Sequence, residues 1–110
     1  MNKSIIGLLM LFFSTSAIAS TSNGKIIDYW IHNFHDSFAF TVENQTGRPY
    51  CASYGTIAGR YVVDTTTEKG KLIATAVMAA KAADTSVHVE GTGDCLYYTD
   101  SEDLNWLHVE

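Results

Sequence analysis

The first group of side chains that could do chemistry is His32, His35 and Asp36. Imidazole nitrogens and a carboxylate are common zinc ligands, and a His-x-x-His pair can supply two of them. On a strand, a spacing of three residues puts the two rings on opposite faces, unless a turn redirects His35. We therefore favour a turn at residues 35–37 over a metal site, and we expect neither a metal nor a cofactor.

An acidic cluster, formed by Asp100, Glu102 and Asp103, is the second such group. Carboxylates close together in a loop can bind calcium, but these three lack the alternating ligand spacing of an EF-hand loop. We interpret the cluster as a solvated turn between two strands. The sequence also lacks the G-x-S-x-G, H-E-x-x-H, P-loop and G-x-G-x-x-G motifs. It therefore predicts no catalytic residue, and a hydrolase triad assembled across strands is the remaining enzymatic alternative.

The aromatic side chains after residue 19 are a third group that could bind a ligand. Most of them must lie in a core. One that stays at the surface could stack on the C–H face of a sugar ring while the sugar hydroxyls meet polar neighbours. Trp30 is the candidate for this role, and His32 follows it on the same face of a predicted strand.

The cysteines are Cys51 and Cys95. An even number of cysteines in an exported protein is typical of a disulfide. Closing so long a loop would stabilise the fold by about 4 kcal/mol. A redox or metal role would require a closer partner cysteine or a histidine pattern nearby, and the sequence has neither, so we predict a structural disulfide.

Export is predicted by residues 1–19, which read as a signal peptide. The apolar run Ile5–Phe13 is too short to span a bilayer as a stable helix. Residues 17–19, Ala-Ile-Ala, have the small-x-small pattern that signal peptidase recognises. We expect cleavage after Ala19 and a mature chain that begins at Ser20, with a retained membrane anchor as the alternative. The mature protein would then be secreted or periplasmic in a bacterium.

Residues 20–110 are enough for one domain and too few for two. Removing the signal peptide takes away Lys3 and no acid, so the formal net charge changes from −5 to −6. An acidic domain repels phosphate backbones, which argues against nucleic acid as a partner. After cleavage, no segment of the sequence is apolar and long enough to span a membrane.

Apolar and alternating runs predict strands on both sides of one helix. A polar lead-in at 20–24 comes first, and we expect it to be mobile. The strand at 25–34 carries large apolar groups on both faces, so we expect it to be central or covered on both sides. The strand at 38–43 alternates an aromatic face with a smaller one and should be half-buried. Further strands are expected at 50–57, 60–63, 85–90 (with Val87 and Val89 inward), 95–99 and 105–110.

An Ala-rich helix follows the strand at 60–63. Thr65 and Glu68 have the spacing of a capping box, which would satisfy free backbone N–H groups at the start of the helix. The predicted core face consists of Leu72, Ile73, Ala76, Val77, Ala80 and Ala83. The predicted outer face consists of Lys71, Thr75, Met78, Ala79 and Ala82. Either this weakly charged outer face packs on another copy of the chain, or it is rich in alanine because alanine is the best helix former.

This order of elements predicts an α+β, mainly β fold. We expect a small barrel of the oligonucleotide/oligosaccharide-binding (OB) type, with about six short strands and the Ala-rich helix closing the gap.

Three short motifs add a family resemblance: Pro49-Tyr50-Cys51, Val87-His88-Val89 and Gly91-x-Gly93-x-Cys95. With the order of elements, they resemble small exported bacterial proteins related to the receptor-binding B subunit of subtilase cytotoxin. That group is also similar to pertussis-like and typhoid-toxin B subunits. The resemblance implies a small barrel with one long helix, and rings of five in which the helices line a channel. It also implies binding of sialylated or other glycans, a catalytic A subunit as partner, and a sugar-contacting serine at Ser22.

The resulting hypothesis is an exported, non-enzymatic subunit that binds a glycan or receptor and forms oligomers, with Ser22, Trp30 and His32 as glycan-binding candidates. The outer helix face, from Lys71 to Ala82, would then be the oligomer interface. The alternative is a periplasmic module that binds or inhibits another protein and has the same barrel without a toxin partner.

Overall fold

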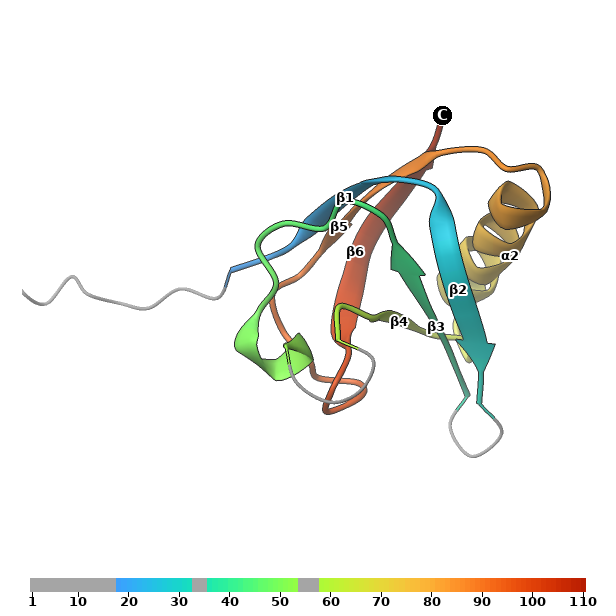
Figure 1. Ribbon diagram of the computed structural model, residues 1–110. Coiled ribbons are helices and arrows are strands. Elements are labelled where there is room, and N and C mark those ends of the chain that lie inside the picture. The colour runs from blue at the N-terminus through green and yellow to red at the C-terminus, as the bar shows by residue number, and fades with distance from the viewer. Residues whose placement is uncertain (1–17, 33–35, 54–57) are drawn as a thin grey trace, which may run out of the picture.

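The computed structural model describes residues 18–32, 36–53 and 58–110, which form six strands, a short 3₁₀ helix and one α-helix (Figure 1). Within these residues, the predicted mainly β fold with a single long helix is confirmed. The elements are β1 (Thr21–Gly24), β2 (Ile26–Ile31), β3 (Ser37–Val42), η2 (Tyr50–Ala52), β4 (Tyr61–Asp64), α2 (Glu68–Ala82), β5 (Val87–Gly91) and β6 (Glu102–Val109).

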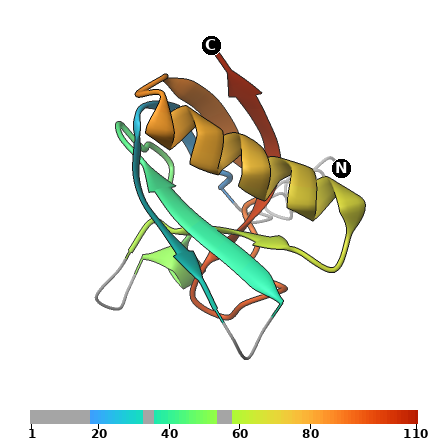
Figure 2. The same ribbon diagram turned by 90° about the vertical axis from the view of Figure 1, so that its right-hand side faces the viewer.

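The strands form one curved sheet, a half-barrel, in the order β1-β5-β6-β4-β3-β2. Neighbouring strands are antiparallel except β4 and β6, which are parallel. The chain reaches this parallel pairing by a crossover through α2 and β5, because parallel strands cannot be joined by a tight turn. The helix lies across one face of the sheet, where it contacts β2, β4 and β6 (Figure 2). This architecture is compatible with an OB-like barrel.

The core lies between this face of the sheet and α2. Phe38 and Phe40 of β3 and Tyr61 of β4 pack side by side in it. The ring centroids of Phe38 and Phe40 are 6.1 Å apart, and those of Phe40 and Tyr61 are 5.5 Å apart. Val87 and Val89 of β5 are fully buried, as their alternation predicts. The prediction of a half-buried β3 is wrong, because the residues on its second face, such as Ala39, are also buried beneath other parts of the chain.

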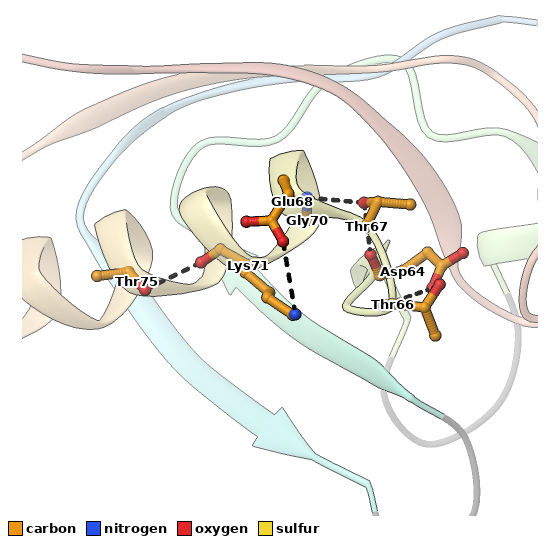
Figure 3. A network of polar contacts seen from close by, with 7 residues as sticks. All are labelled: Asp64, Thr66, Thr67, Glu68, Gly70, Lys71 and Thr75. Atoms are coloured by element: carbon orange, nitrogen blue, oxygen red, sulfur yellow. Dashed lines mark hydrogen bonds and ion pairs between the residues drawn. The ribbon is translucent and has the colours of Figure 1, made fainter.

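The start of α2 differs from the predicted capping box (Figure 3). The N-cap is Thr67, whose Oγ1 accepts a hydrogen bond from Gly70 N at 2.9 Å. Thr65 lies in the preceding turn, which Asp64 closes by accepting bonds from both the backbone N–H and the hydroxyl of Thr66. The helix therefore begins two residues later than a cap at Thr65 would place it.

The rotation of α2 corrects part of the predicted core face. Leu72 is 69% exposed and Ala83 is exposed, whereas Ala74 is buried and Met78 packs partly against the core. Gly70 explains this rotation, because a Cβ at that position would collide with the carbonyl group of Asp64. The glycine lets the first turn lie directly on the end of β4, and this contact turns Ala74, Val77 and Ala80 toward the sheet.

The predicted central or covered position of residues 25–34 is wrong. β2 is an edge strand that pairs only with β3 among the described strands, and its residues Ile27, Tyr29 and Ile31 are exposed. The large apolar side chains on both faces of β2 therefore did not mean that both faces are buried. Residues 33–35, which include His35 of the predicted turn, lie outside the described residues.

The predicted mobile lead-in at 20–24 is also wrong. Residues Thr21–Gly24 form β1, which pairs with β5, and Ser20 and Ser22 are buried. Ser20 and Ser22 are small enough to pack inside the sheet, where their hydroxyl groups find hydrogen-bond partners. Polarity alone therefore did not indicate exposure.

Two other predicted strands are absent from the described residues. Residues 50–52 form the 3₁₀ helix η2, and residues 54–57 of that predicted strand lie outside the description. In the predicted strand 95–99, the backbone N–H groups of Leu96 and Tyr97 donate to the Asp103 carboxylate instead of a neighbouring strand. The final strand β6 is longer than predicted because it begins at Glu102.

The predicted disulfide is present between Cys51 and Cys95, with 6.2 Å between the Cα atoms. It joins η2 to the segment between β5 and β6. Within the described residues, no helix has the length and hydropathy needed to cross a membrane.

Candidate functional site

The candidate site is built around Arg60, the residue that precedes β4. Its side chain is only 9% exposed, and Nη2 lies 3.0 Å from Asp100 Oδ1 in an ion pair. Nε donates to Ser101 Oγ at 3.0 Å. Two aromatic rings lie beside the guanidinium, because Cζ is 5.4 Å from the ring centroid of Trp30 and 5.8 Å from that of Tyr98. These distances are typical of cation–π contacts.

The sheet places Trp30 on the face opposite the helix. Trp30 of β2 lies beside Ala39 of β3, and Ala39 lies beside Val62 of β4. Phe38 and Phe40 belong to the core, so Ala39 between them faces the other way. Trp30, Ala39 and Val62 thus form one row across three strands, and the indole ring at the sheet edge stays partly exposed.

His32 and Tyr98 extend the site beyond the end of β2. Their ring centroids are 5.4 Å apart, and both side chains are half-buried. Tyr98 therefore contacts both the His32 ring and the Arg60 guanidinium. The cluster of Trp30, His32, Arg60, Tyr98 and Asp100 presents aromatic surface next to charged hydrogen-bonding groups, and we call it the Arg60 cluster.

Arg60 supplies the hydrogen-bond donors of this cluster. The planar fork of an arginine side chain offers five N–H donors. The hydrogen bonds to Asp100 and Ser101 account for two of these donors. The aromatic rings of the cluster can thus stack on an apolar surface of a ligand, while the guanidinium donates hydrogen bonds beside them. This combination suits ligand binding.

Of the three predicted glycan-binding residues, the structure brings Trp30 and His32 into one cluster and places Ser22 elsewhere. Ser22 is 1% exposed, and its Oγ lies 2.6 Å from Tyr61 Oη inside the half-barrel. Its hydroxyl is therefore part of an internal network. A role for Ser22 in glycan contact stays a prediction from the resemblance, and the geometry adds no support to it.

The predicted interface residues of α2 divide into two sets. Lys71, Thr75, Ala79 and Ala82 are exposed on the side away from the sheet, whereas Met78 is partly buried against the core. The hydroxyl of Thr75 donates to the Lys71 carbonyl oxygen within the helix, and Lys71 Nζ lies 3.8 Å from Glu68 Oε2 (Figure 3). The exposed strip also includes Leu72. Its role as an interface stays a prediction.

A concave region lies where α2 begins, away from the Arg60 cluster. It is a cleft of about 220 Å³ whose walls include Asp64, Thr67, Tyr97 and Leu104. Hydrogen bonds from the hydroxyl and then the backbone N–H of Thr66 lower the pKa of Asp64. Desolvation, followed by the nearby negative charge of Asp64, raises the pKa of Tyr97. Both effects act within the cleft at the start of α2.

Sequence reasoning missed Arg60, Tyr98 and Asp100 as members of one site. Arg60 and Asp100 are 40 residues apart in the chain, and only the parallel pairing of β4 with β6 brings their segments together. The acidic cluster was also misjudged, because Glu102 is 1% exposed and Asp103 accepts two backbone hydrogen bonds. The one signal in the sequence was that these acids come directly before the predicted strand at 105–110, so that a longer strand would include them.

Comparisons with protein-family models, curated proteins and solved structures find no match to this chain. The description of the site therefore depends on the geometry of the chain itself.

Proposed function

We propose that this protein is an exported, non-enzymatic binding subunit that recognises glycans through the Arg60 cluster. The observation that carries the proposal is the half-exposed Trp30 ring beside the guanidinium of Arg60, with Tyr98 on the same cation. Aromatic rings stack on the C–H faces of sugars, and charged planar donors bind sugar hydroxyl or carboxylate groups. The Cys51–Cys95 disulfide supports the secreted or periplasmic location, since disulfides persist in oxidising compartments.

The further parts of this proposal come from the family resemblance. They are a barrel of the OB type, a ring of five subunits with α2 toward its axis, a sialylated or other host glycan as receptor, and a catalytic A subunit as partner. The exposed residues Leu72, Thr75 and Ala79 support a helix-to-helix interface, because small or apolar side chains allow close packing.

The test uses the fact that the chain has two tryptophans, Trp30 and Trp106. In a Trp106→Phe variant, the fluorescence of Trp30 alone reports on the cluster. We expect the Trp30 emission to change and then saturate as a sialylated oligosaccharide is added. A neutral oligosaccharide of the same length should need a higher concentration to give the same change. With binding measured by titration calorimetry, Trp30→Ala should abolish it, while the matched variant Trp106→Ala, at a ring on β6 that is 38% exposed, should retain it. Equal binding by both alanine variants would contradict the glycan site.

The alternative is a module that binds another protein, and one observation favours it. The edge strand β2 presents Ile27 and Ile31, which are 47% and 71% exposed. An edge strand with apolar side chains can accept a strand from a partner. If Ile31→Lys removes association with a co-purifying periplasmic protein and Trp30→Ala has no effect on it, this second function is favoured.

A further inference from the structure

The carboxylate of Glu102, the first residue of β6, is buried and held from several sides. Glu102 is 1% exposed. Oε1 accepts a hydrogen bond from Ser20 Oγ at 2.6 Å, and Oε2 accepts from Gly93 N at 2.8 Å and from Ser20 N at 3.1 Å. Two of the three bonds therefore come from a single residue, Ser20, which lies immediately before β1.

A buried carboxylate usually has a basic partner, because removing a lone charge from water is costly. Within the described residues, no lysine, arginine or histidine forms an ion pair with Glu102. The ion pairs there join Lys25 to Asp84, Arg60 to Asp100 and Lys71 to Glu68. The nearest group that can become a cation by a chemical change is the backbone nitrogen of Ser20.

The surroundings of Ser20 hold this nitrogen in place. Ser20 is fully buried, its carbonyl oxygen accepts a hydrogen bond from Gly91 N at 2.9 Å, and its Oγ lies 2.9 Å from Tyr61 Oη. Gly91 also makes room for the acid, since a Cβ at this position would collide with the Glu102 carboxylate. The site thus fixes both the donor nitrogen and the acceptor oxygen.

We propose that Glu102 is the internal counter-ion of the mature N-terminus, and that its partner is the α-ammonium group of Ser20. This inference depends on the expected cleavage after Ala19 and not on the glycan site. Hydrolysis of the Ala19–Ser20 peptide bond consumes one water, leaves a carboxylate on Ala19 and a primary amine on Ser20. The amine binds a proton below its ordinary pKa of about 8. Signal removal thereby converts a neutral N–H donor, already 3.1 Å from Oε2, into a cation.

The path of the chain before Ser20 fits this role. Ala19 is half-buried, Ile18 is 61% exposed, and the Ala19 carbonyl oxygen lies beside Gly47. Ile18 and Ala19 thus lead outward from Ser20, so removing them leaves the Ser20 nitrogen in place. Because Ser20 is covered in the folded protein, cleavage precedes folding, and the ion pair then stabilises only the processed chain.

The test compares two refolded, oxidised chains that contain every element of the fold, one beginning at Ser20 and the other at Ala19. In the second chain the Ser20 nitrogen is an amide. At pH 7 we expect the unfolding equilibrium constant of the Ala19 chain to be on the order of tenfold higher, as for exchanging a hydrogen bond from a charged donor for one from a neutral donor. With Glu102→Gln in both chains, the difference should fall below about twofold. Equal stability of the two Glu102 chains, or the same difference in the Gln pair, overturns the proposal.

A second measurement applies if the Gln variants do not fold. An amine-acylating reagent should modify the Ser20 α-amine at least about tenfold more slowly in the native state than in denaturant. The exposed Lys81 is the control, because its rate should change little. Equal rates at Ser20 overturn the proposal. An exported protein whose intact mass shows a first residue other than Ser20 also overturns it, and leaves the Trp30→Ala glycan test unaffected.

Discussion

Arg60 and Glu102 lie side by side where the parallel β4–β6 pair begins, because Tyr61, the first residue of β4, is directly opposite Glu102, the first residue of β6. This pairing also brings the Glu102 backbone N–H to the Arg60 carbonyl oxygen, at 2.9 Å. The backbone contact fixes Arg60 next to Ser101 and Asp100, which bind its guanidinium. The Arg60 cluster is therefore a direct product of the parallel β4–β6 pairing.

Replacing Arg60 with lysine should weaken both the fold and the binding site. Lysine keeps the charge but loses the planar fork that reaches Ser101 and Asp100 together, so we expect a loss of about 1.5–3 kcal/mol in the free energy of unfolding. Urea denaturation measures this loss. Arg48→Lys is the matched control, because Arg48 is exposed and should tolerate lysine within about 0.5 kcal/mol. Equal losses in the two variants would show that the buried contacts of Arg60 contribute little.

Reducing the Cys51–Cys95 disulfide should destabilise the protein strongly. The bond spans 44 residues, and in the chain-entropy treatment a loop of this length corresponds to about 4 kcal/mol. Thermal unfolding with and without reductant, followed by circular dichroism, measures the shift in Tm. A double Cys51→Ser, Cys95→Ser variant should unfold at the temperature of the reduced protein and should not respond to reductant. An unchanged Tm on reduction is the contrary result.

Ala79→Glu should disrupt an assembly that uses the outer face of α2. Ala79 is exposed in the last turn of the helix, where a charged side chain would be costly if another helix packs against it. We expect the mature protein to have the mass of an oligomer by native mass spectrometry, and the variant to have a lower mass. Asn105→Glu adds the same charge on exposed β6 and should leave the mass unchanged. If Ala79→Glu and wild type have the same mass, the outer face is ordinary exposed helix.

Asp64, in the turn before α2, should make the free energy of unfolding fall as the pH is lowered. Hydrogen bonds from Thr66 lower the Asp64 pKa from its ordinary value of 3.8. Because the folded pKa is below the unfolded value, this group stabilises the fold above pH 3.8, and the contribution is lost as the pH falls through the folded pKa. Urea midpoints measured between about pH 5 and pH 2 should fall less steeply for Asp64→Asn than for wild type.

Thr66→Ala provides the internal comparison for this effect. It removes the hydroxyl bond to Asp64 and keeps the backbone one, so its acid dependence should lie between those of wild type and Asp64→Asn. The same acid dependence in all three proteins would mean that other carboxylates control unfolding at low pH.

The local sequence determined several features of this protein. The alternation around His88 predicts that Val87 and Val89 are buried, and both are. The Ala-rich segment predicts the one long helix, and the even cysteine count predicts the disulfide. Each of these follows from the period of a short segment or from a residue type, so no knowledge of distant partners is needed.

Only the tertiary structure decided which of the polar residues are buried and which of the apolar residues are exposed. Ser20 and Glu102 read as solvated, yet they are buried because β1 and β6 each pair with β5 and bring the two side chains together. Leu72 reads as core, yet it is exposed because contact of Gly70 with Asp64 sets the rotation of α2. The Arg60 cluster likewise depends on strand order. Pairing between distant segments fixes these positions, and the periodicity of one segment carries no information about its partners.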